Sequence, residues 1–510
     1  MRLMTSLLRQ KILEEEGESF PSHTYLKMVL QPAYDEAKQN FLQNMLHIHT
    51  SHLIMLEEQG LVSKEEANKI VRSIAAIEVS QLQAGSYNPK FEDLFFQVEY
   101  EMIQHAGDIA GNLHIARSRN DMGIAIYRMT LREKLVALIK NSLHLRESLI
   151  ELAEEHKETI MIGYTHTQQA QPTTLAHYFV AMIDQLSRDI KRLQAAYQTV
   201  NKSSMGAAAL TTSGFPICRY KMQELLGFDS LIENAWDAVS GADYIMESAS
   251  AVQLAALNLG RSAQDLLLWG TQEFGAFKLA APYVQISSIM PQKRNPVSIE
   301  HIRALLSSVS GDAQTVLTMV HNTPFGDIVD TEDDMQPYVW RAIDRLKGIY
   351  TLLSSVLLTM KVDKDLLLKR AKESFANVTE LADTIVREEG LSFRQAHQIV
   401  SMTVRKLSEN GKEQLSDLTL FLLNEHAEKV IGRPLSLTEE LFKQSLNPKY
   451  FISVRTLPGG PAISRMNSTL QEKRNEQEVL LEWITEKEVS LKRYKCLLNE
   501  YVQKGINDGK

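Results

Sequence analysis

The sequence contains little cysteine and no long apolar run. Its two cysteines, Cys218 and Cys496, stand far apart in a chain of 510 residues, and they are too few for a disulfide framework or a thiolate zinc site. We therefore expect a reducing, cytoplasmic location. Nowhere do about 18 apolar residues follow one another, the minimum for a membrane-spanning helix. The N-terminal stretch has no small-residue cleavage site and soon reaches three glutamates at 14–16, so it does not resemble a signal peptide.

The charge balance also excludes a class of partner. Lys and Arg number 55 against 63 Asp and Glu, which gives a net charge of −8, and aromatic residues make up 7%. A mildly acidic chain supplies no general field that attracts phosphate backbones, so nucleic-acid binding is disfavoured. By contrast, 44% hydrophobic and 23% charged residues are typical of a globular protein with a sizeable core. The length predicts two to four domains, or one large bundle with appendages.

Proline is scarce too, and its absence marks the long helices. No proline occurs at positions 90–171, 217–281 or 338–433, and each gap is long enough for a helix of about thirty residues or more. In the first gap, apolar residues recur at spacings of three, four or seven, at Ile124, Tyr127, Leu131, Leu135, Leu138, Leu145, Leu149 and Leu152. This stripe predicts one bundle helix about 45 Å long. Strand-like alternation is scarce, so we predict an all-α protein with an elongated bundle of long helices.

Changes in this pattern suggest a division of the chain. We expect an N-terminal helical domain at 1–112, a central long-helix domain at 113–361, a C-terminal helical domain at 362–463 and a helical tail at 464–510. The tail is amphipathic and rich in charge, which is typical of a helix docked on its own protein. The alternative is a helix that binds a partner, as in a helical adaptor.

Three short segments between the long helices carry side chains suited to chemistry. The first, at 114–121, precedes the first long helix. Its Asn120 or Asp121 could simply cap that helix, and its arginines could be surface charges. The functional alternative is an anion cradle, because Ser118, Arg119 and Asn120 would present hydrogen-bond donors beside a helix N-terminus, a geometry suited to a carboxylate.

The second segment, at 163–172, connects two helical stretches and is dense in hydrogen-bonding groups. It contains His166 beside Thr165 and three glutamines. A lone histidine is more often a structural residue than a catalyst. In this company, however, His166 is a candidate for proton exchange near pH 7.

The third segment, at 287–296, contains two serines, a lysine and an asparagine in a loop bounded by prolines. Asn295 could be the N-cap of the next helix and Pro296 its first residue, which explains only two of its ten positions. The loop also offers a proton acceptor, a cation at Lys293 and amide donors for developing negative charge.

Other clusters favour a structural interpretation. Three histidines at 47, 49 and 52 lack a carboxylate ligand set, so we do not expect a metal site there. The small residues at 203–209 lack the glycine spacing of a nucleotide-binding loop. The acidic stretch at 327–334 is most simply a solvated loop, with recognition of a cationic substrate group as the sharper alternative and a metal ion as a third.

Taken together and in this order, the three segments resemble the signature regions of the fumarase/aspartase superfamily, and most closely those of the argininosuccinate lyase family. The loop Ser-Ser-x-Met-Pro-x-Lys-x-Asn-Pro is similar across the superfamily, whereas the segments at 117–121 and 163–172 are similar to the argininosuccinate lyase branch. The resemblance spans roughly residues 25 to 463. Further matches lie at Asn234, 237–240, 273–275, 381–383, 393–397, Arg455 and 459–461.

The resemblance implies a fold, an assembly and a reaction. It implies a three-domain all-α fold and a homotetramer in which three different subunits contribute the three segments to each active site. It also implies β-elimination from an N-substituted aspartate, which releases fumarate and an amine. Removal of the proton beside a carboxylate creates a doubly charged aci-carboxylate, and fixed donors and a cation must stabilise that charge.

The resemblance also assigns the residues closest to bond breaking. Ser287 would be the general base on a mobile loop, and Lys293 with Asn295 would stabilise the carbanion. His166 paired with Glu300 would tune the proton relay at the leaving nitrogen. Serine as a base does not follow from its type alone, because an unactivated hydroxyl is a poor proton acceptor; by residue type, His166 would be preferred.

The remaining assigned residues bind the substrate. By the same resemblance, the carboxylates of the fumarate half would be held by Ser118, Arg119, Asn120 and Thr165, and Gln171 belongs to the substrate-binding segment. No metal, nucleotide or flavin requirement is indicated by the sequence.

This sequence departs from the family pattern mainly on the amine side. Phe325 and Asp330 stand where the family has a tyrosine and a glutamine that hold the arginine half. Ile286 replaces a glycine before the serine loop, which predicts reduced backbone freedom, and 114–116 reads His-Ile-Ala in place of His-Thr-Gly. An N-terminal Leu-Trp-Gly-Gly-Arg-Phe stretch is missing. Groups that serve the fumarate half are retained, while those that serve the amine half are altered.

The sequence therefore predicts a fumarate-releasing C–N lyase with argininosuccinate as its substrate, in the setting of arginine biosynthesis. The first alternative is a lyase of the same mechanism that acts on another N-(dicarboxyethyl) amine or amino acid, since Asp330 would favour a cation. The second is a catalytically silent structural homologue. The second alternative is disfavoured because the chain retains all four predicted catalytic residues, Ser287, His166, Lys293 and Glu300.

Overall fold

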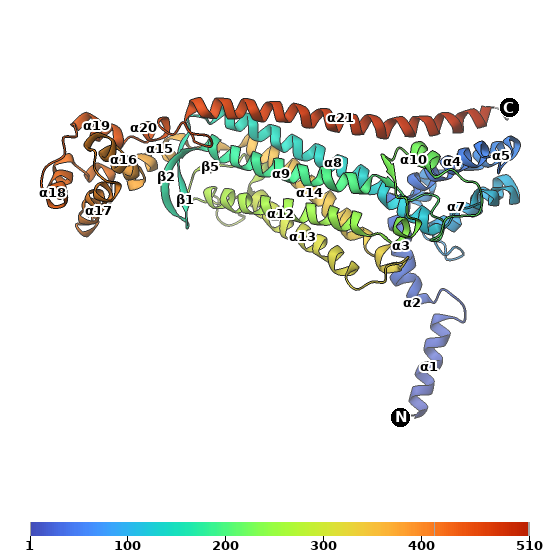
Figure 1. Cartoon of the computed structure of the whole chain (residues 1–510). Coiled ribbons are helices and arrows are strands. Elements are labelled where there is room, and N and C mark those ends of the chain that lie inside the picture. The colour runs from blue at the N-terminus through green and yellow to red at the C-terminus, as the bar shows by residue number, and fades with distance from the viewer. Residues whose placement is uncertain (1, 413, 508–510) are drawn as a thin grey trace.

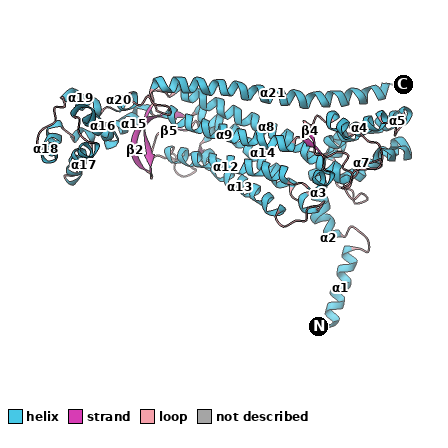
Figure 2. Cartoon of the chain, in the orientation of Figure 1, coloured by secondary structure: helices cyan, strands magenta, loops and turns pink. Residues whose placement is uncertain are grey.

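The computed structural model describes residues 2–412 and 414–507. Figure 2 shows a chain built almost entirely of helices. The N-terminal part contains α1 (Arg2–Glu16), α2 (His23–Tyr25), η1 (Leu26–Leu30), α3 (Gln31–Asn40), α4 (Leu42–Glu58), α5 (Lys64–Ala75), α6 (Val79–Ala84), α7 (Leu94–Ala106) and η2 (Gly107–His114).

The middle of the chain contains α8 (Arg119–Glu155), β1 (Ile160–Thr165), β2 (Gln168–Thr174), α9 (Leu175–Val200), β3 (Lys202–Ser203), α10 (Arg219–Leu225), β4 (Ser230–Leu231), α11 (Ala235–Ser240), α12 (Asp243–Trp269), β5 (Phe277–Lys278), η3 (Ala281–Tyr283), β6 (Gln285–Ile286), β7 (Arg294–Asn295), α13 (Val297–Val320), η4 (Val329–Thr331), α14 (Gln336–Thr359) and β8 (Lys361–Val362). The remainder contains α15 (Lys364–Glu373), η5 (Phe375–Asn377), α16 (Val378–Glu389), α17 (Phe393–Glu409), η6 (Leu415–Asp417), α18 (Leu420–Ile431), α19 (Glu439–Ser445), α20 (Pro448–Ser453) and α21 (Ile463–Asn507).

Five long helices, α8, α9, α12, α13 and α14, lie side by side and form the central bundle (Figure 1). The predicted apolar stripe lies on α8, whose 37 residues make it about 55 Å long at 1.5 Å per residue. Leu131, Leu135, Leu138 and Leu145 on this stripe are completely buried. The helices run up and down, so the loops between them fall at two opposite ends of the bundle. The predicted all-α bundle is confirmed.

The tail forms one helix, α21, which runs along the bundle from the C-terminal helices back to α4 and α5 (Figure 1). Its central anchor is Arg146 of α8, a completely buried side chain. Arg146 donates to Gln477 Oε1 at 2.8 Å and to Glu476 Oε2 at 2.9 Å. A buried guanidinium requires such partners, since its desolvation is otherwise costly. The tail therefore docks on its own chain, as its amphipathic pattern predicts.

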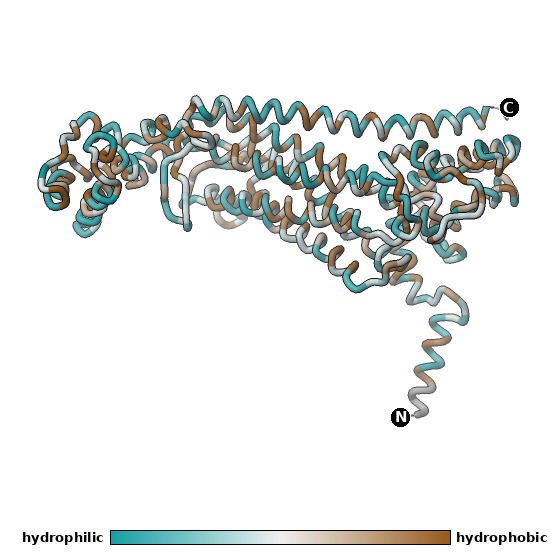
Figure 3. The backbone as a smooth tube through the Cα atoms, viewed as in Figure 1, coloured by the Kyte–Doolittle hydropathy of each residue, from teal (hydrophilic) through white to brown (hydrophobic). Residues whose placement is uncertain are grey.

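At the other terminus, α1 points away from the rest of the molecule, and Figure 3 shows apolar positions recurring along it. Leu7, Leu8 and Leu13 on this helix are all more than half exposed. Within residues 2–412 and 414–507, no helix combines the length and the apolar character needed to cross a membrane.

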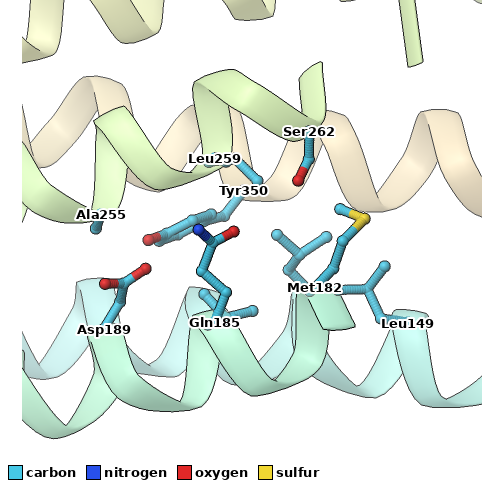
Figure 4. A pocket seen from close by; sticks show the side chains of 10 residues that line it. Leu149, Met182, Gln185, Asp189, Ala255, Leu259, Ser262 and Tyr350 are labelled. Carbon is cyan, nitrogen blue, oxygen red and sulfur yellow. The ribbon is translucent and has the colours of Figure 1, made fainter. Parts of the chain in front are cut away.

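A small cavity lies inside the bundle between α8, α9, α12 and α14 (Figure 4). Its polar lining includes Asp189, which accepts hydrogen bonds from Asn258 at 2.8 Å and Arg192 at 2.7 Å. Burial raises the pKa of Asp189, while these two partners lower it. The side chains that line this cavity include none of the predicted site residues. This cavity is therefore not the predicted site.

Candidate active site

The first predicted segment forms the start of α8, and Ser118 is its N-cap. The Ser118 Oγ accepts from the Asn120 backbone N–H at 3.3 Å, and the Asp121 side chain accepts from the Ser118 N–H at 3.0 Å. This reciprocal capping box satisfies backbone donors at the helix start. The cap is therefore Ser118, and not Asn120 or Asp121 as the structural interpretation supposed. Arg119 and Asn120 in the first turn do not serve as the cap.

The Arg119 side chain is oriented by α7. Its Nη1 donates to Asp93 Oδ2 at 2.7 Å, and its guanidinium lies 4.8 Å from the centre of the Phe96 ring. Asp93 is itself the N-cap of α7, through a bond from the Phe96 N–H at 3.0 Å. Two helix starts are thus joined at Arg119. Because 45% of the Arg119 side chain is exposed, its remaining donors are open to a carboxylate.

The small residues at 203–209 hold this helix start from the other side. Asp121 Oδ2 accepts from the backbone N–H groups of Gly206 at 2.8 Å and Ala208 at 3.0 Å, and Ser204 Oγ donates to the Asp121 carbonyl at 2.8 Å. Burial raises the pKa of Asp121 to about 6, against the opposing effect of these backbone donors. Sequence reasoning dismissed this loop, because its role depends on a contact about 85 residues away and no local spacing announces it.

Ala116 lies just before the cap in a left-handed conformation, with φ of 58°. It stands in the His-Ile-Ala run where the family pattern has a glycine. A residue with a Cβ is destabilised by about 1 kcal/mol at such a φ, whereas glycine is not.

We expect Ala116→Gly to raise the free energy of unfolding by about 1 kcal/mol, because it relieves this backbone strain. Denaturant unfolding of the two proteins at one concentration measures the change. Ala125→Gly is the matched control: Ala125 lies inside α8 and is completely buried, so the same substitution should destabilise. A lower stability for Ala116→Gly would contradict the strain argument.

The second segment is the tip of a β-hairpin and not a simple connection between helices. Strands β1 and β2 pair antiparallel, with Thr165 opposite Gln168. The turn residues His166 and Thr167 have φ of 50° and 62°, as a two-residue hairpin turn of the primed type requires. Non-glycine residues in this region are strained, and such strain clusters at functional sites. Thr165 and His166 are exposed at the tip.

Gln171 lies further down the same hairpin. Its side-chain amide donates to Thr379 Oγ1 at 3.4 Å, so it faces the C-terminal helices instead of the hairpin tip. Its role in substrate binding stays a prediction.

The third segment is closed by a short antiparallel pair, in which Gln285 lies opposite Asn295 and Ile286 opposite Arg294. Ile286 therefore has extended backbone, which any residue adopts, and this pairing does not require the glycine of the family pattern. Inside the loop, the Ser287 Oγ accepts from the backbone N–H groups of Ile289 at 3.3 Å and Met290 at 3.0 Å. Two donors aimed at one oxygen stabilise negative charge on it.

The other members of this loop are open to solvent. Lys293 is exposed and Asn295 is half-buried at the end of β7. Pro296 is the N-cap of α13, one residue later than the predicted cap at Asn295. Glu300 is exposed on the first turn of α13, and in the part of the chain that the structure describes no ion pair joins it to His166. The predicted pairing of these two groups stays a prediction.

The loop between α13 and α14 carries the residues expected to contact the amine. Phe325 and Asp330 are exposed, and the Phe325 carbonyl accepts from Trp236 Nε1 at 2.9 Å. The acidic stretch is only partly solvated, because Tyr127 donates to Asp333 Oδ1 at 2.6 Å. Burial, with Asp327 nearby, raises the pKa of Glu332 to about 8.

His49 and His52 of α4 lie directly behind the first segment, while the ring of His47 contacts that of Tyr494 on α21. His47 and His52 are buried, and burial lowers their pKa to about 4 and about 3. Burial likewise lowers the pKa of His49, and the positive charge of Arg117 adds to the shift for both His49 and His52. Among the residues described, no group of three or more His, Cys, Asp or Glu side chains is arranged to hold a metal ion.

We expect the buried histidines of α4 to lower the free energy of unfolding below pH 6.5, the usual histidine pKa. In the folded state these histidines stay neutral, so only the unfolded state binds the protons, and stability falls from pH 6.5 towards the folded values near 3 to 4. Carboxyls with a raised pKa, among them Asp121 and Glu332, oppose this trend, so the contribution of a single histidine is measured by its substitution. His52→Gln should reduce the loss between pH 6.5 and pH 5 by about 2 kcal/mol.

Denaturant unfolding at pH 6.5 and pH 5, at one protein concentration, measures that difference. The matched control is His144→Gln on α8, an exposed histidine, which should leave the difference unchanged. An equal loss for His52→Gln and the unsubstituted protein would contradict a neutral, buried His52.

The predicted site residues fall into two groups at opposite ends of the bundle (Figure 1). Ser118, Arg119 and Asn120 lie where α8 begins, near Phe325 and Asp330. Thr165 and His166 follow the other end of α8, about 55 Å away at 37 residues. The Ser287 loop lies at the same end as the hairpin, between α12 and α13. One chain therefore does not bring the two groups together.

Comparisons with known proteins identify the chain. A family model described as "Lyase" matches residues 30–311, and one described as "Argininosuccinate lyase C-terminal" matches residues 375–453. Argininosuccinate lyase 2 of Agrobacterium fabrum is 39% identical over 454 residues, which cover 88% of this chain and 89% of the relative. The chain belongs to the argininosuccinate lyase family. The predicted family, within the fumarase/aspartase superfamily, is confirmed.

Other relatives of this argininosuccinate lyase family member agree. The argininosuccinate lyase of Methanosarcina mazei is 37% identical over 436 residues, covering 85% of this chain and 87% of the relative. Among solved structures, an EDDS lyase variant with bound fumarate is 29% identical and superposes with a TM-score of 0.86, covering 96% of this chain and 97% of that one. A class II fumarase from Schistosoma mansoni, at 15% identity, has a TM-score of 0.67 and covers 86% and 93%, which shows the shared fold.

Proposed function

We propose that this protein catalyses the reversible β-elimination of argininosuccinate to arginine and fumarate. A base takes a proton from the carbon beside a carboxylate, the electron pair of that C–H bond forms the double bond of fumarate, and the C–N bond breaks. The electron pair of the C–N bond stays on nitrogen, which takes up a proton. The argininosuccinate lyases that match most of the chain support this substrate.

The geometry of Ser287 carries this proposal. A serine hydroxyl is a poor base because its alkoxide is unstable. Here the Ile289 and Met290 N–H groups point at the Ser287 Oγ at 3.3 and 3.0 Å, and Lys293 follows in the same loop. Donors and a nearby cation favour the charged form of an oxygen acid, so Ser287 is suited to accept the carbon-bound proton.

The same loop and the hairpin supply the remaining chemistry. We assign Lys293 and Asn295 to the aci-carboxylate, whose second negative charge needs preorganised donors. His166 at the hairpin tip is suited to give a proton to the leaving nitrogen, with Glu300 as the group that tunes it.

The carboxylates of the fumarate half are assigned to Ser118, Arg119, Asn120 and Thr165. The helix start at Ser118 favours an anion, and Asp93 fixes the direction of the Arg119 guanidinium at 2.7 Å. Fixed donors lower the ordering cost of binding.

We further propose a homotetramer with shared active sites. Support comes from the 55 Å that α8 places between the two groups of site residues, and from an apolar face on the bundle. Leucines that would normally be buried are at least 38% exposed on three bundle helices, at Leu254, Leu257, Leu268, Leu305 and Leu358. Such a surface favours association of long helices. Two free cysteines fit the proposed cytoplasmic location.

One observation favours a second candidate for the amine half of the substrate. The solved EDDS lyase is similar over nearly the whole chain, and Phe325 and Asp330 are the altered positions of the amine loop. An exposed aspartate favours a cationic group, which both arginine and other amines carry. A lyase for another N-(dicarboxyethyl) amine is therefore the second candidate.

Incubation with fumarate and a panel of amines tests the proposal. Arginine should give an adduct of argininosuccinate mass at a rate far above every other amine. A faster reaction with a diamine or another amino acid would favour the second candidate. No adduct with any amine, under conditions where the protein is folded, would overturn the lyase assignment.

A further inference from the structure

We propose that Arg117, His49 and His52 form a buried platform that positions the carboxylate-binding turn Ser118–Asn120. This inference rests on the proposed function, because it gives a role to residues behind the assigned carboxylate site. Arg117 is a positioning residue: it lies immediately before the turn, with its guanidinium directed inward and not towards the substrate.

The contact between Arg117 and α4 fixes the first part of the platform. Arg117 Nη1 lies 2.9 Å from His49 Nδ1. A guanidinium only donates, so His49 Nδ1 is the acceptor and its ring carries its proton on Nε2. Protonation at Nδ1 would place a hydrogen against the arginine and break this bond. The platform therefore requires a neutral His49.

The contact with His52, one helical turn further along α4, fixes the backbone of the turn. His52 Nε2 lies 2.9 Å from the Ile115 carbonyl, which only accepts, so His52 donates from Nε2. This bond lies next to Ala116, whose φ of 58° reverses the chain direction before Ser118. Two histidines on one helix face thus hold both the side chain and the backbone that precede the carboxylate site.

Two carboxyl groups near the platform act on the charge of Arg117. His114 pairs with Glu99 of α7 at 2.6 Å, Asp121 is held by the 203–209 loop, and both carboxyls act on Arg117 from a distance. Arg117 Nη2 is buried and has no hydrogen-bond partner among the described residues.

The proposed reaction gains three positioning residues from this arrangement. Arg117 and the two histidines do not touch the reacting atoms. They set where the Ser118 hydroxyl, the Arg119 guanidinium and the Asn120 amide stand. Because these groups bind carboxylates throughout the reaction, a displaced turn should weaken binding of substrate and transition state alike, which raises KM more than it lowers kcat.

Paired substitutions of each histidine test the platform in the full-length enzyme. The side-chain oxygen of asparagine takes the place of Nδ1, and the amide nitrogen of glutamine takes that of Nε2. His49→Asn keeps the acceptor for Arg117, whereas His49→Gln moves it. His52→Gln keeps the donor to Ile115, whereas His52→Asn does not. Asparagine thus keeps the hydrogen bond at position 49 and loses it at position 52, and glutamine does the reverse. The comparison therefore separates the effect of the hydrogen bond from that of side-chain size.

We expect His49→Gln and His52→Asn to raise KM for fumarate about tenfold or more, with kcat within about threefold of the parent. His49→Asn and His52→Gln should stay within about threefold in KM. Thermal unfolding midpoints of all four proteins identify loss of folding. The same KM for both substitutions at each position would overturn the platform, as would a fall in kcat without a change in KM.

Asn120→Ala separates failure of the platform from failure of the proposed function. A raised KM for Asn120→Ala with unchanged values for His49→Gln and His52→Asn overturns the platform alone. An unchanged KM for Asn120→Ala as well overturns the carboxylate assignment on which the platform rests.

Discussion

Replacement of Ser287 by alanine is expected to lower kcat by about a thousandfold or more, without a comparable change in KM. A positioned general base contributes about 10² to 10⁴ in rate, and about 10³ corresponds to about 4 kcal/mol of transition-state stabilisation. The variant keeps Arg119 and Asn120, the proposed carboxylate-binding residues, so substrate binding should persist. Growth of fumarate absorbance at 240 nm from argininosuccinate measures the rate.

Gln292→Ala is the control for this experiment. Gln292 is exposed in the same loop, at the variable position between the motif proline and Lys293, so its loss should leave kcat within about twofold. Activity retained in Ser287→Ala would remove the serine as base and return His166, the preferred proton acceptor by residue type, to that role.

The backbone around Ser287 offers a reason, which the residue type does not, why this hydroxyl could act as a base. From the sequence, the hydroxyl had no stated activation, and only family resemblance favoured it over His166. The amide groups of Ile289 and Met290 donate to the Ser287 Oγ because the loop turns back over its own first residue, and this supports the proposed role of Ser287 as base. A motif can name the residue, but the turn that points two donors at one oxygen is visible only in coordinates.

The long helices were predictable because their pattern is local. Apolar residues at three- and four-residue spacing define the buried face of α8 whatever surrounds it. The hairpin β1–β2 was not predictable for the opposite reason. Ile160 and Ile162 pack against Phe451 and Ile452 of α20, while Met161 between them joins the bundle core. A strand buried on both faces loses the alternation that marks strands.

The α4 histidines show the same limit for the site. Sequence spacing placed His49 and His52 on one helix face and raised only the question of a metal. Their partners, Arg117 and the Ile115 carbonyl, lie more than 60 residues away. The motif residues thus predict the proposed substrate-binding surface, and the fold supplies the groups that hold these residues in place.

Mixing two inactive variants, Arg119→Gln and Ser287→Ala, is expected to restore about a quarter of the wild-type activity. If Arg119 and Ser287 of one site come from different chains, random assembly at equal amounts leaves each group intact with probability about one half. About one site in four then holds both intact groups. The separation along α8, 37 residues or about 55 Å, is the physical reason to expect this sharing.

A second mixture distinguishes shared sites from sites within one chain. The double variant Arg119→Gln, Ser287→Ala is combined in equal amounts with the wild-type chain, and both mixtures are co-expressed or refolded together. Shared sites again give about one quarter activity, because each site draws Arg119 and Ser287 independently. Sites within one chain give about one half here and none in the first mixture. One-half activity in the second mixture, with none in the first, would mean that the two ends of one bundle meet. The length of α8 forbids this.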